Sequence, residues 1–245
     1  MVPFELRKLA NGIVLLGMVA ACGPTPLSPS GSEGPGQPAP EGQASLPPPA
    51  AIASALPHLP QPPPVVIPIR GALVGSACRL PPVVAPTPAP TPQSFGEYDP
   101  TTGLHVTGEA PTVDLATYRL AVTGRVDHPL SLTYDQLRCL PKVSVHCELV
   151  CPGVFVDVAT WAGTPFESVF DLAGVQSGAQ SIVLVGADGY STMVGLDLVK
   201  SSHGFLAYEL NGGTLPVLHG FPLRAVFPGV EGSRWAKWVV TIEVQ

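Results

Sequence analysis

Apolar and polar residues alternate along several short runs in the second half of the chain, a pattern typical of β-strands with one buried face. The runs predict strands over residues 118–124, 142–150, 181–186, 191–196, 205–210, 223–227 and 238–244. Every other residue of a strand faces the same side. In the second run the side chains expected to share one face are those of Val143, Val145, Cys147, Leu149 and Cys151.

Capping signals mark the starts of two helices. Thr133 and Gln136 have the spacing of a capping box, in which each side chain bonds the backbone of the other residue. Thr164 precedes a proline and stands three positions before Glu167, which predicts a second helix that ends at Gly174.

One further short helix is expected over residues 197–201, so the predicted strands still outnumber the predicted helices. Two turns join strands directly: Asp188-Gly-Tyr190, and Asn211-Gly-Gly213, which is of hairpin type. Many short strands with two or three short helices indicate a mixed, strand-rich α+β fold. Residues 96–245 are long enough to form a single domain with its own core.

Proline density separates the rest of the chain from this domain. Of the 31 prolines, 21 lie between Pro24 and Pro92. Residues 23–95 carry few charges and few large apolar side chains, so they predict a disordered, Pro/Ala-rich linker that acts as a spacer. Residues 65–80 are its more apolar part and could instead pack on the domain.

The first residues have the order of a secretory signal. Arg7 and Lys8 precede an apolar stretch that is too short for a comfortable membrane span, and Val19-Ala-Ala-Cys22 follows. This ending resembles the lipobox of bacterial lipoproteins, which implies that residues 1–22 are a signal peptide and that Cys22 carries the lipid. We therefore expect an exported protein that is lipid-anchored on the extracytoplasmic face of the bacterial cell membrane.

The globular part is acidic, yet its C-terminal stretch is cationic. Residues 95–245 contain 8 Lys/Arg and 15 Asp/Glu, a formal charge of 8 − 15 = −7, which argues against nucleic acid as a partner. Arg224, Arg234 and Lys237 fall among Gly/Pro turns, whose backbone N–H groups can form anion-binding nests. The stretch predicts a site for one anion; the alternative is ordinary solvated surface charge.

The cysteines offer both a disulfide and a metal ligand. Cys139 and Cys147 flank a turn at Pro141 and could pair outside the cytosol, although spacing alone does not decide connectivity. Cys151 ends a strand and is followed by Pro and Gly, so its thiol is expected to project from a loop. A thiolate there is a soft ligand suited to a transition metal, and the alternative is a small buried side chain.

Seven segments of the domain resemble the molybdopterin-binding domain of the sulfite oxidase family, over nearly all of residues 110–244. In chain order they are Tyr118-Arg-Leu-Ala-Val-Thr-Gly-Arg-Val-Asp-His-Pro129, Leu149-Val-Cys-Pro-Gly153, Trp161-Ala-Gly163, Ala187-Asp-Gly-Tyr190, Ala207-Tyr-Glu-Leu-Asn-Gly212, His219-Gly-Phe-Pro-Leu-Arg224 and Lys237-Trp238. The resemblance implies a molybdenum–molybdopterin cofactor and one protein cysteine that completes the coordination of the metal. Cys151, which lies ten residues before Trp161, matches that cysteine, and Cys147 is the alternative.

The same resemblance implies the other site residues. Asp188 and Tyr190 match positions that border the family's metal pocket, where the Tyr190 hydroxyl could bond an oxo group or substrate; the alternative for this pair is a simple hairpin turn. The positions that match contacts to the cofactor's phosphate and pterin are His219, Arg224, Gly229, Gly232, Ser233 and Lys237.

By the resemblance, the expected activity is transfer of an oxygen atom to or from a small substrate, with electrons passed to a separate protein or quinone-linked partner. The segment after Cys151 lacks the arginine that helps sulfite oxidases hold their anionic substrate, and the chain carries no Cys-x-x-Cys-His haem site. It ends at Gln245 without the family's dimerisation domain, which predicts a monomer. The alternative function is a cofactor-free relic of the fold that acts as a surface binding or structural module.

Overall fold

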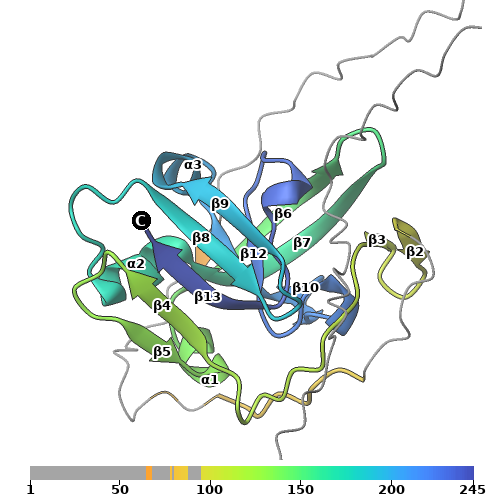
Figure 1. The fold of residues 1–245 in the computed structure, drawn as a ribbon. Coiled ribbons are helices and arrows are strands. Elements are labelled where there is room, and N and C mark those ends of the chain that lie inside the picture. The colour runs from red at the N-terminus through yellow and green to blue at the C-terminus, as the bar shows by residue number, and fades with distance from the viewer. Residues whose placement is uncertain (1–64, 68–77, 79, 88–94) are drawn as a thin grey trace, which may run out of the picture.

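The computed structural model describes residues 65–67, 78, 80–87 and 95–245, and Figure 1 shows their path. The expected signal peptide and Cys22 lie outside the described residues. No helix in these ranges is long and apolar enough to cross a membrane. Strands predominate over short helices in the described part of the chain, which confirms the mixed, strand-rich α+β class.

One antiparallel sheet carries most of the residues that form the site. Its strand order is β1–β6–β7–β10–β11, and β12 also pairs with β10. The strands are β1 (Val65–Ile67), β6 (Lys142–Cys151), β7 (Phe155–Pro165), β10 (Phe205–Leu210), β11 (Gly213–Thr214) and β12 (Arg224–Val226).

The second sheet has the order β5–β4–β13–β8–β9, in which β13 runs parallel to β4 and antiparallel to β8. A separate hairpin of β2 and β3 precedes this sheet in the chain. The strands are β2 (Glu97–Asp99), β3 (Leu104–Val106), β4 (Leu120–Gly124), β5 (Leu130–Leu132), β8 (Ser181–Gly186), β9 (Ser191–Gly195) and β13 (Val239–Val244).

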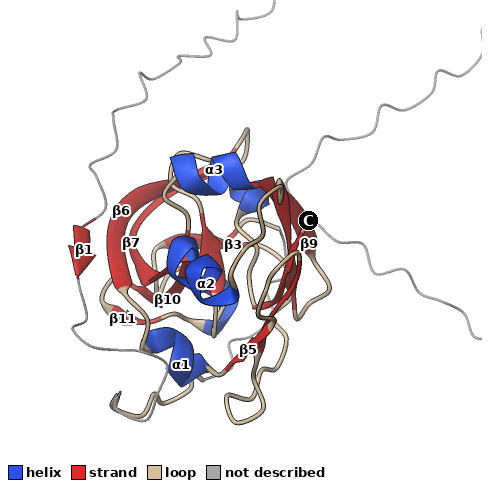
Figure 2. Cartoon of the chain, turned by 90° about the vertical axis from the view of Figure 1, so that its left-hand side faces the viewer, coloured by secondary structure: helices blue, strands red, loops and turns tan. Residues whose placement is uncertain are grey.

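Short helices connect the strands. Figure 2 shows α1, α2 and α3 on one side of the molecule, between the sheet that contains β6 and β7 and the sheet that contains β5 and β9. The helices are α1 (Tyr134–Arg138), α2 (Phe166–Ala173) and α3 (Leu196–Ser201), and the 3-10 turns are η1 (Val217–His219) and η2 (Gly232–Arg234).

Side chains from both sheets and from α2 form one buried cluster. Trp161 of β7, Phe205 of β10 and Leu120 of β4 are fully buried in it. Phe166 of α2 stacks on Phe227 with 5.4 Å between the ring centroids. This packing fixes β12 and β13, and the site lies along the segments that flank those two strands.

The predicted strands are all present, and one of the two helix starts is correct. Thr133 and Gln136 form the capping box at α1. The helix start predicted at Thr164 is wrong, because Thr164 still belongs to β7, where its hydroxyl donates to the carbonyl of Leu137 at 2.8 Å. Helix α2 begins at Phe166 without a side-chain cap.

Part of the proline-rich segment is attached to the domain. Strand β1 pairs with β6, Cys78 forms a disulfide with Cys139, and the guanidinium of Arg138 donates to the carbonyl of Pro81 at 3.3 Å. The described residues of the segment therefore contact the domain, which fits the alternative given for residues 65–80 rather than a free spacer throughout residues 23–95.

The disulfide also corrects the pairing considered for Cys139. Cys147 is a free, buried cysteine, so the Cys139–Cys147 pair is wrong. The actual partner, Cys78, lies 61 positions earlier in the chain, where local spacing gives no signal. In the chain-entropy model, closing a loop of this length stabilises the fold by about 4 kcal/mol.

Candidate functional site

Arg224 of β12 lies at the centre of the residues assigned to the cofactor. It is buried between two indoles, with its guanidinium carbon 4.9 Å from the ring centroid of Trp161 and 5.8 Å from that of Trp235. Its Nη1 donates to the carbonyl of His219 at 3.1 Å, whereas its Nε has no hydrogen-bond partner in the described part of the chain. Burial lowers the pKa of Arg224 to about 10, so the side chain stays charged at neutral pH.

Lys237 is a second cation in the same cluster. Some of its surface is exposed, but its Nζ is enclosed: it donates to the carbonyls of Thr107 and Leu218, the latter at 3.1 Å, and lies 4.3 Å from the ring centroid of Trp238. Burial lowers the pKa of Lys237 well below its usual value, and the charge of Arg224 lowers it further. The ion pairs among the described residues include neither cation. Two enclosed cations without a carboxylate fit an anion supplied from outside the chain.

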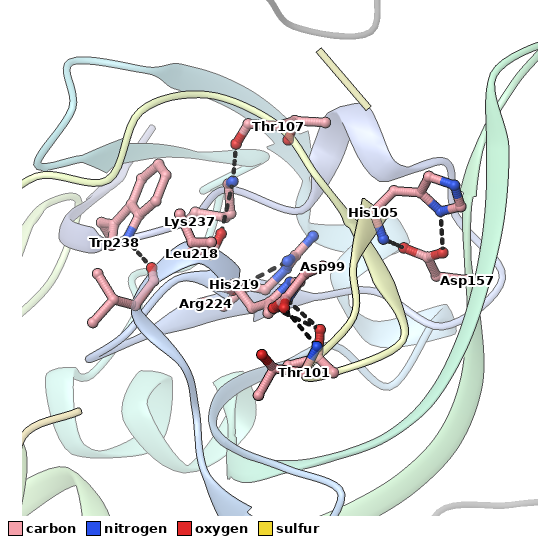
Figure 3. Close-up of polar contacts among 12 residues, drawn as sticks. Asp99, Thr101, His105, Thr107, Asp157, Leu218, His219, Arg224, Lys237 and Trp238 are labelled. Carbon is pink, nitrogen blue, oxygen red and sulfur yellow. Dashed lines mark hydrogen bonds and ion pairs between the residues drawn. The ribbon is translucent and has the colours of Figure 1, made fainter. Parts of the chain in front are cut away.

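His219 completes the cluster at the end of η1, as Figure 3 shows. Its Nε2 lies 2.8 Å from the hydroxyl of Thr102 and 3.1 Å from the carboxylate of Asp99. Burial lowers the pKa of His219 to about 4, and the charge of Arg224 acts in the same direction, so the imidazole is neutral at pH 7. Because a carboxylate only accepts, we assign the proton to Nε2, which leaves Nδ1 as an acceptor.

We expect His219 to make the cofactor-free protein sensitive to acid. Its pKa is about 4 in the folded state against 6.5 as the ordinary value, so the unfolded chain binds a proton first as the pH falls. Stability is therefore lost between about pH 6.5 and pH 4, by about 3 kcal/mol at 1.36 kcal/mol per unit. Urea unfolding measured across this window checks the slope. His219→Gln should flatten it, and an equally steep loss in that variant would assign the effect to other groups.

The turn between β8 and β9 lies beside the same cluster. The negative charge of Asp188 acts on Lys237, where it opposes the lowering of the pKa by burial. The hydroxyl of Tyr190 donates to the carbonyl of Ser233. The structure therefore brings the predicted metal-pocket turn together with two of the predicted cofactor residues.

The turn that contains Gly229 and Gly232 packs against the end of β6. Gly229 has a φ of +78°, which favours glycine. A Cβ atom on Gly232 would lie 2.8 Å from the side chain of Leu149 and 3.2 Å from the carbonyl oxygen of Val150, so a larger residue does not fit without movement. This close approach joins the turn to the strand end that carries Cys151.

Cys151 is the last residue of β6, and it is 2 % exposed. The prediction that its thiol projects from a loop is wrong, because the alternation of β6 turns it inward on the same face as Cys147. The sulfur of Cys151 is disulfide-bonded, so a thiolate must be released before it can bind a metal. Burial raises the pKa of the Cys147 thiol to about 12, although the nearby charge of Arg224 opposes the shift.

The β2–β3 hairpin contributes residues that the sequence did not reveal. Asp99 and Thr102 hydrogen-bond to His219, although they lie 120 and 117 residues before it in the chain. His105 pairs with Asp157 of β7 from 52 residues away, with 2.7 Å between Nδ1 and Oδ1. No motif spacing connects such distant partners. The one local sign of this pair in the sequence is Asp157, a charged residue at a buried position of the largely apolar strand β7.

The family model for the oxidoreductase molybdopterin binding domain matches residues 107–245. The matched range begins directly after β3 and contains Arg224, Lys237 and His219. Together with the strand-rich α+β fold and the enclosed cations, this match defines a cofactor-binding oxidoreductase domain. The chain belongs to the oxidoreductase molybdopterin binding domain family.

Relatives with this domain differ in size and activity. The uncharacterized oxidoreductase YuiH of Bacillus subtilis is 32% identical over 142 residues, which are 57% of this chain and 71% of YuiH. The sulfite oxidase of Arabidopsis thaliana is 33% identical over 174 residues, which cover 56% of this chain and 44% of that protein. An NADH nitrate reductase of Ulva prolifera is 32% identical over 171 residues, but the chain spans only 20% of its length.

A solved structure has the same fold. The sulfane dehydrogenase SoxCD of Paracoccus pantotrophus superimposes with a TM-score of 0.55 over 62% of this chain and 44% of that chain, at 23% sequence identity. The likeness supports the α+β architecture described above.

The family and its relatives indicate a molybdenum cofactor, and the residues present fit one. The cofactor carries a phosphate, and Arg224 and Lys237 are enclosed cations that lack an anion in the described part of the chain. The Nε atom of Arg224 is buried and unpaired there, as expected of a donor whose acceptor is a bound group.

Proposed function

We propose that this protein is a molybdenum-cofactor oxidoreductase that transfers an oxygen atom to or from a small substrate. The observation that carries the proposal is the cluster of Arg224 and Lys237, two enclosed cations with no carboxylate partner among the described residues. A structural cluster would pair its charges internally, whereas a site for an anionic cofactor leaves them for the ligand.

In this proposal the cofactor supplies two-electron redox chemistry, and the chain binds and orients it. Cys151 provides the thiolate ligand of the metal once its sulfur is released from the disulfide. Asp188 and Tyr190 border the reacting position, and the bond from Tyr190 to Ser233 holds that side chain in place. The residues that hold the phosphate and pterin are His219, Arg224, Gly229, Gly232, Ser233 and Lys237.

Sulfite is not the substrate that the residues favour, because the segment directly after Cys151, Pro-Gly-Val-Phe-Val, contains no cation. Electrons are passed to a separate carrier. A relative from Azospira oryzae is named as a subunit of a putative protein-methionine-sulfoxide reductase, which supports a partner for this chain as well.

Metal and pterin analysis of the natively produced protein tests the proposal. We expect one molybdenum and one pterin per chain, and turnover with at least one substrate in a screen of sulfite, sulfoxides and N-oxides. A folded protein without either component would instead support the alternative, a cofactor-free relic that acts as a binding or structural module.

We also propose that the protein is exported and lipid-anchored through Cys22. The Cys78–Cys139 disulfide supports this location, because disulfides persist in oxidising compartments outside the cytosol. Labelling with a radioactive fatty acid should mark the wild-type protein in the membrane fraction and leave Cys22→Ser unlabelled. Label that persists in Cys22→Ser would exclude this anchor.

A further inference from the structure

His105 and Asp157 form a second polar pair, which the proposed function does not use. Nδ1 of His105 lies 2.7 Å from Oδ1 of Asp157, and the backbone N–H of His105 donates to Oδ2 at 2.8 Å. The side chain of Asp157 is 2 % exposed and that of His105 is 31 % exposed. One buried carboxylate therefore fixes both the backbone and the ring of a partly open histidine.

The second ring nitrogen of His105 is available for a ligand. Because the carboxylate of Asp157 accepts from Nδ1–H, Nε2 is the unprotonated nitrogen of the neutral ring. Figure 3 shows this nitrogen on the opposite side of the ring from Asp157. No hydrogen bond from the described residues reaches it.

The pair lies on the inner face of the β6–β7 hairpin, between the two candidate metal-binding cysteines. In the strand register, Asp157 stands between the positions that face Cys147 and Cys151. The ring of His105 stacks on Phe155, with 4.6 Å between centroids and 9° between planes. Phe155 is the cross-strand partner of Cys151. His105 therefore packs on the residue that lies opposite Cys151 across the hairpin.

Charge links the pair to the cofactor cluster. The negative charge of Asp157 acts on Arg224, where it opposes the lowering of the pKa by burial. Asp157 therefore acts electrostatically on a buried guanidinium as well as bonding the imidazole of His105. The other titratable side chain that contacts the ring is Tyr98 of β2, which lies edge-on with 5.6 Å between the centroids.

We propose that His105 is the residue that exchanges protons with the substrate or with water during turnover, through Nε2, and that Asp157 positions it. The proposal rests on the proposed function. In the oxidising direction, substrate and water become oxygenated product, two protons and two electrons, and the electrons leave through the cofactor to a one-electron carrier. The O–H bonds of water break, and a base must accept a proton.

Neutral His105 accepts that proton on Nε2, and the buried carboxylate on the other side of the ring stabilises the imidazolium, as a buried aspartate does in hydrolytic triads. In the reducing direction the same imidazolium returns the proton to the water that forms. His105 lies outside the family match, which begins at residue 107. Its role as a proton acceptor is therefore inferred from its contact with Asp157 in this structure.

The test compares His105→Gln and Asp157→Asn with His146→Gln in cofactor-loaded protein. His146 is a matched control, because it is exposed on the outer face of β6 and its Nδ1 also contacts a side chain, Thr160 Oγ1 at 3.1 Å. We expect wild-type molybdenum and pterin content in all three variants. General acid–base catalysis contributes about 10²- to 10⁴-fold, so kcat should fall by at least about 100-fold in His105→Gln. Asp157→Asn should lose less, and His146→Gln should match wild type.

Two further measurements separate catalysis from structure. Added imidazole should restore part of the activity of His105→Ala. Nitrogen-15 NMR of histidine-labelled protein should show the Nδ1–H tautomer of His105 in wild type and a mixture of tautomers in Asp157→Asn. A wild-type kcat in His105→Gln, or an Nε2–H tautomer in wild type, would overturn the inference alone. Absence of molybdenum from wild-type protein would instead overturn the proposed function.

Discussion

Arg224→Met should strip the domain of its cofactor and at the same time stabilise the cofactor-free protein. The guanidinium is buried between Trp161 and Trp235 and, among the described residues, makes one hydrogen bond, to the carbonyl of His219. Replacing buried ionic groups by apolar side chains of similar volume is often neutral or stabilising, by about 1–4 kcal/mol. Without the cofactor, methionine therefore relieves an uncompensated charge.

The cofactor-bound form should respond in the opposite direction. Hydrogen bonds to charged groups contribute about 1.5–3 kcal/mol each, so the loss of one weakens retention of the anion by about 10- to 100-fold. Pterin content measures retention, and urea unfolding of protein from a host without molybdopterin synthesis measures the stability of the free form. A variant that unfolds more easily and keeps its pterin would show that Arg224 is only a brace between the two indoles.

Arg224→Lys is the matched control for this experiment. Lysine keeps the positive charge but not the planar fork of donors that a phosphate accepts in two places. We expect cofactor content between those of wild type and Arg224→Met, with no gain in stability. If lysine and methionine give the same pterin content, charge is not what retains the cofactor.

The strands could be predicted because their signal is local. On β6 the alternation from Val143 to Cys151 is set by burial of one face, and the structure reproduces it residue by residue. Strand β7 was not predicted, because Val156 and Val158 on its outward side remain exposed, as does Val154 just before the strand, and these valines hide the alternation. The same strand continues through Thr164, which is why a good helix-capping sequence there forms no cap.

The site could be predicted only where its residues lie close together in the chain. His219, Arg224 and Lys237 come from one stretch and meet in space, whereas Arg234 of the same stretch donates to the carbonyl of Met193 instead. Asp99 and Asp157 bond His219 and His105 across 120 and 52 positions of the chain, and the Cys78–Cys139 disulfide spans 61 positions. Such contacts depend on how the sheets pack, which no local pattern encodes.

Cys151→Ser should remove nearly all bound molybdenum and lower activity by more than about 100-fold. Serine offers a hard, protonated oxygen in place of a soft thiolate, and even partners of metal ligands contribute 10- to 100-fold. Molybdenum content is the measurement, and the content of wild type is its reference.

Cys147→Ser separates the two cysteines, since both face inward on β6. The Cys147 side chain lies in the apolar cluster with a thiol whose pKa burial raises to about 12, so it is held as a neutral thiol. A serine there leaves a hydroxyl in apolar surroundings, which should cost about 1–3 kcal/mol of stability and leave the molybdenum content unchanged. The reverse result, with metal lost from Cys147→Ser and kept in Cys151→Ser, would place the ligand beside Arg224, near enough for its charge to stabilise a thiolate. Metal retained in both variants would exclude either cysteine as its ligand.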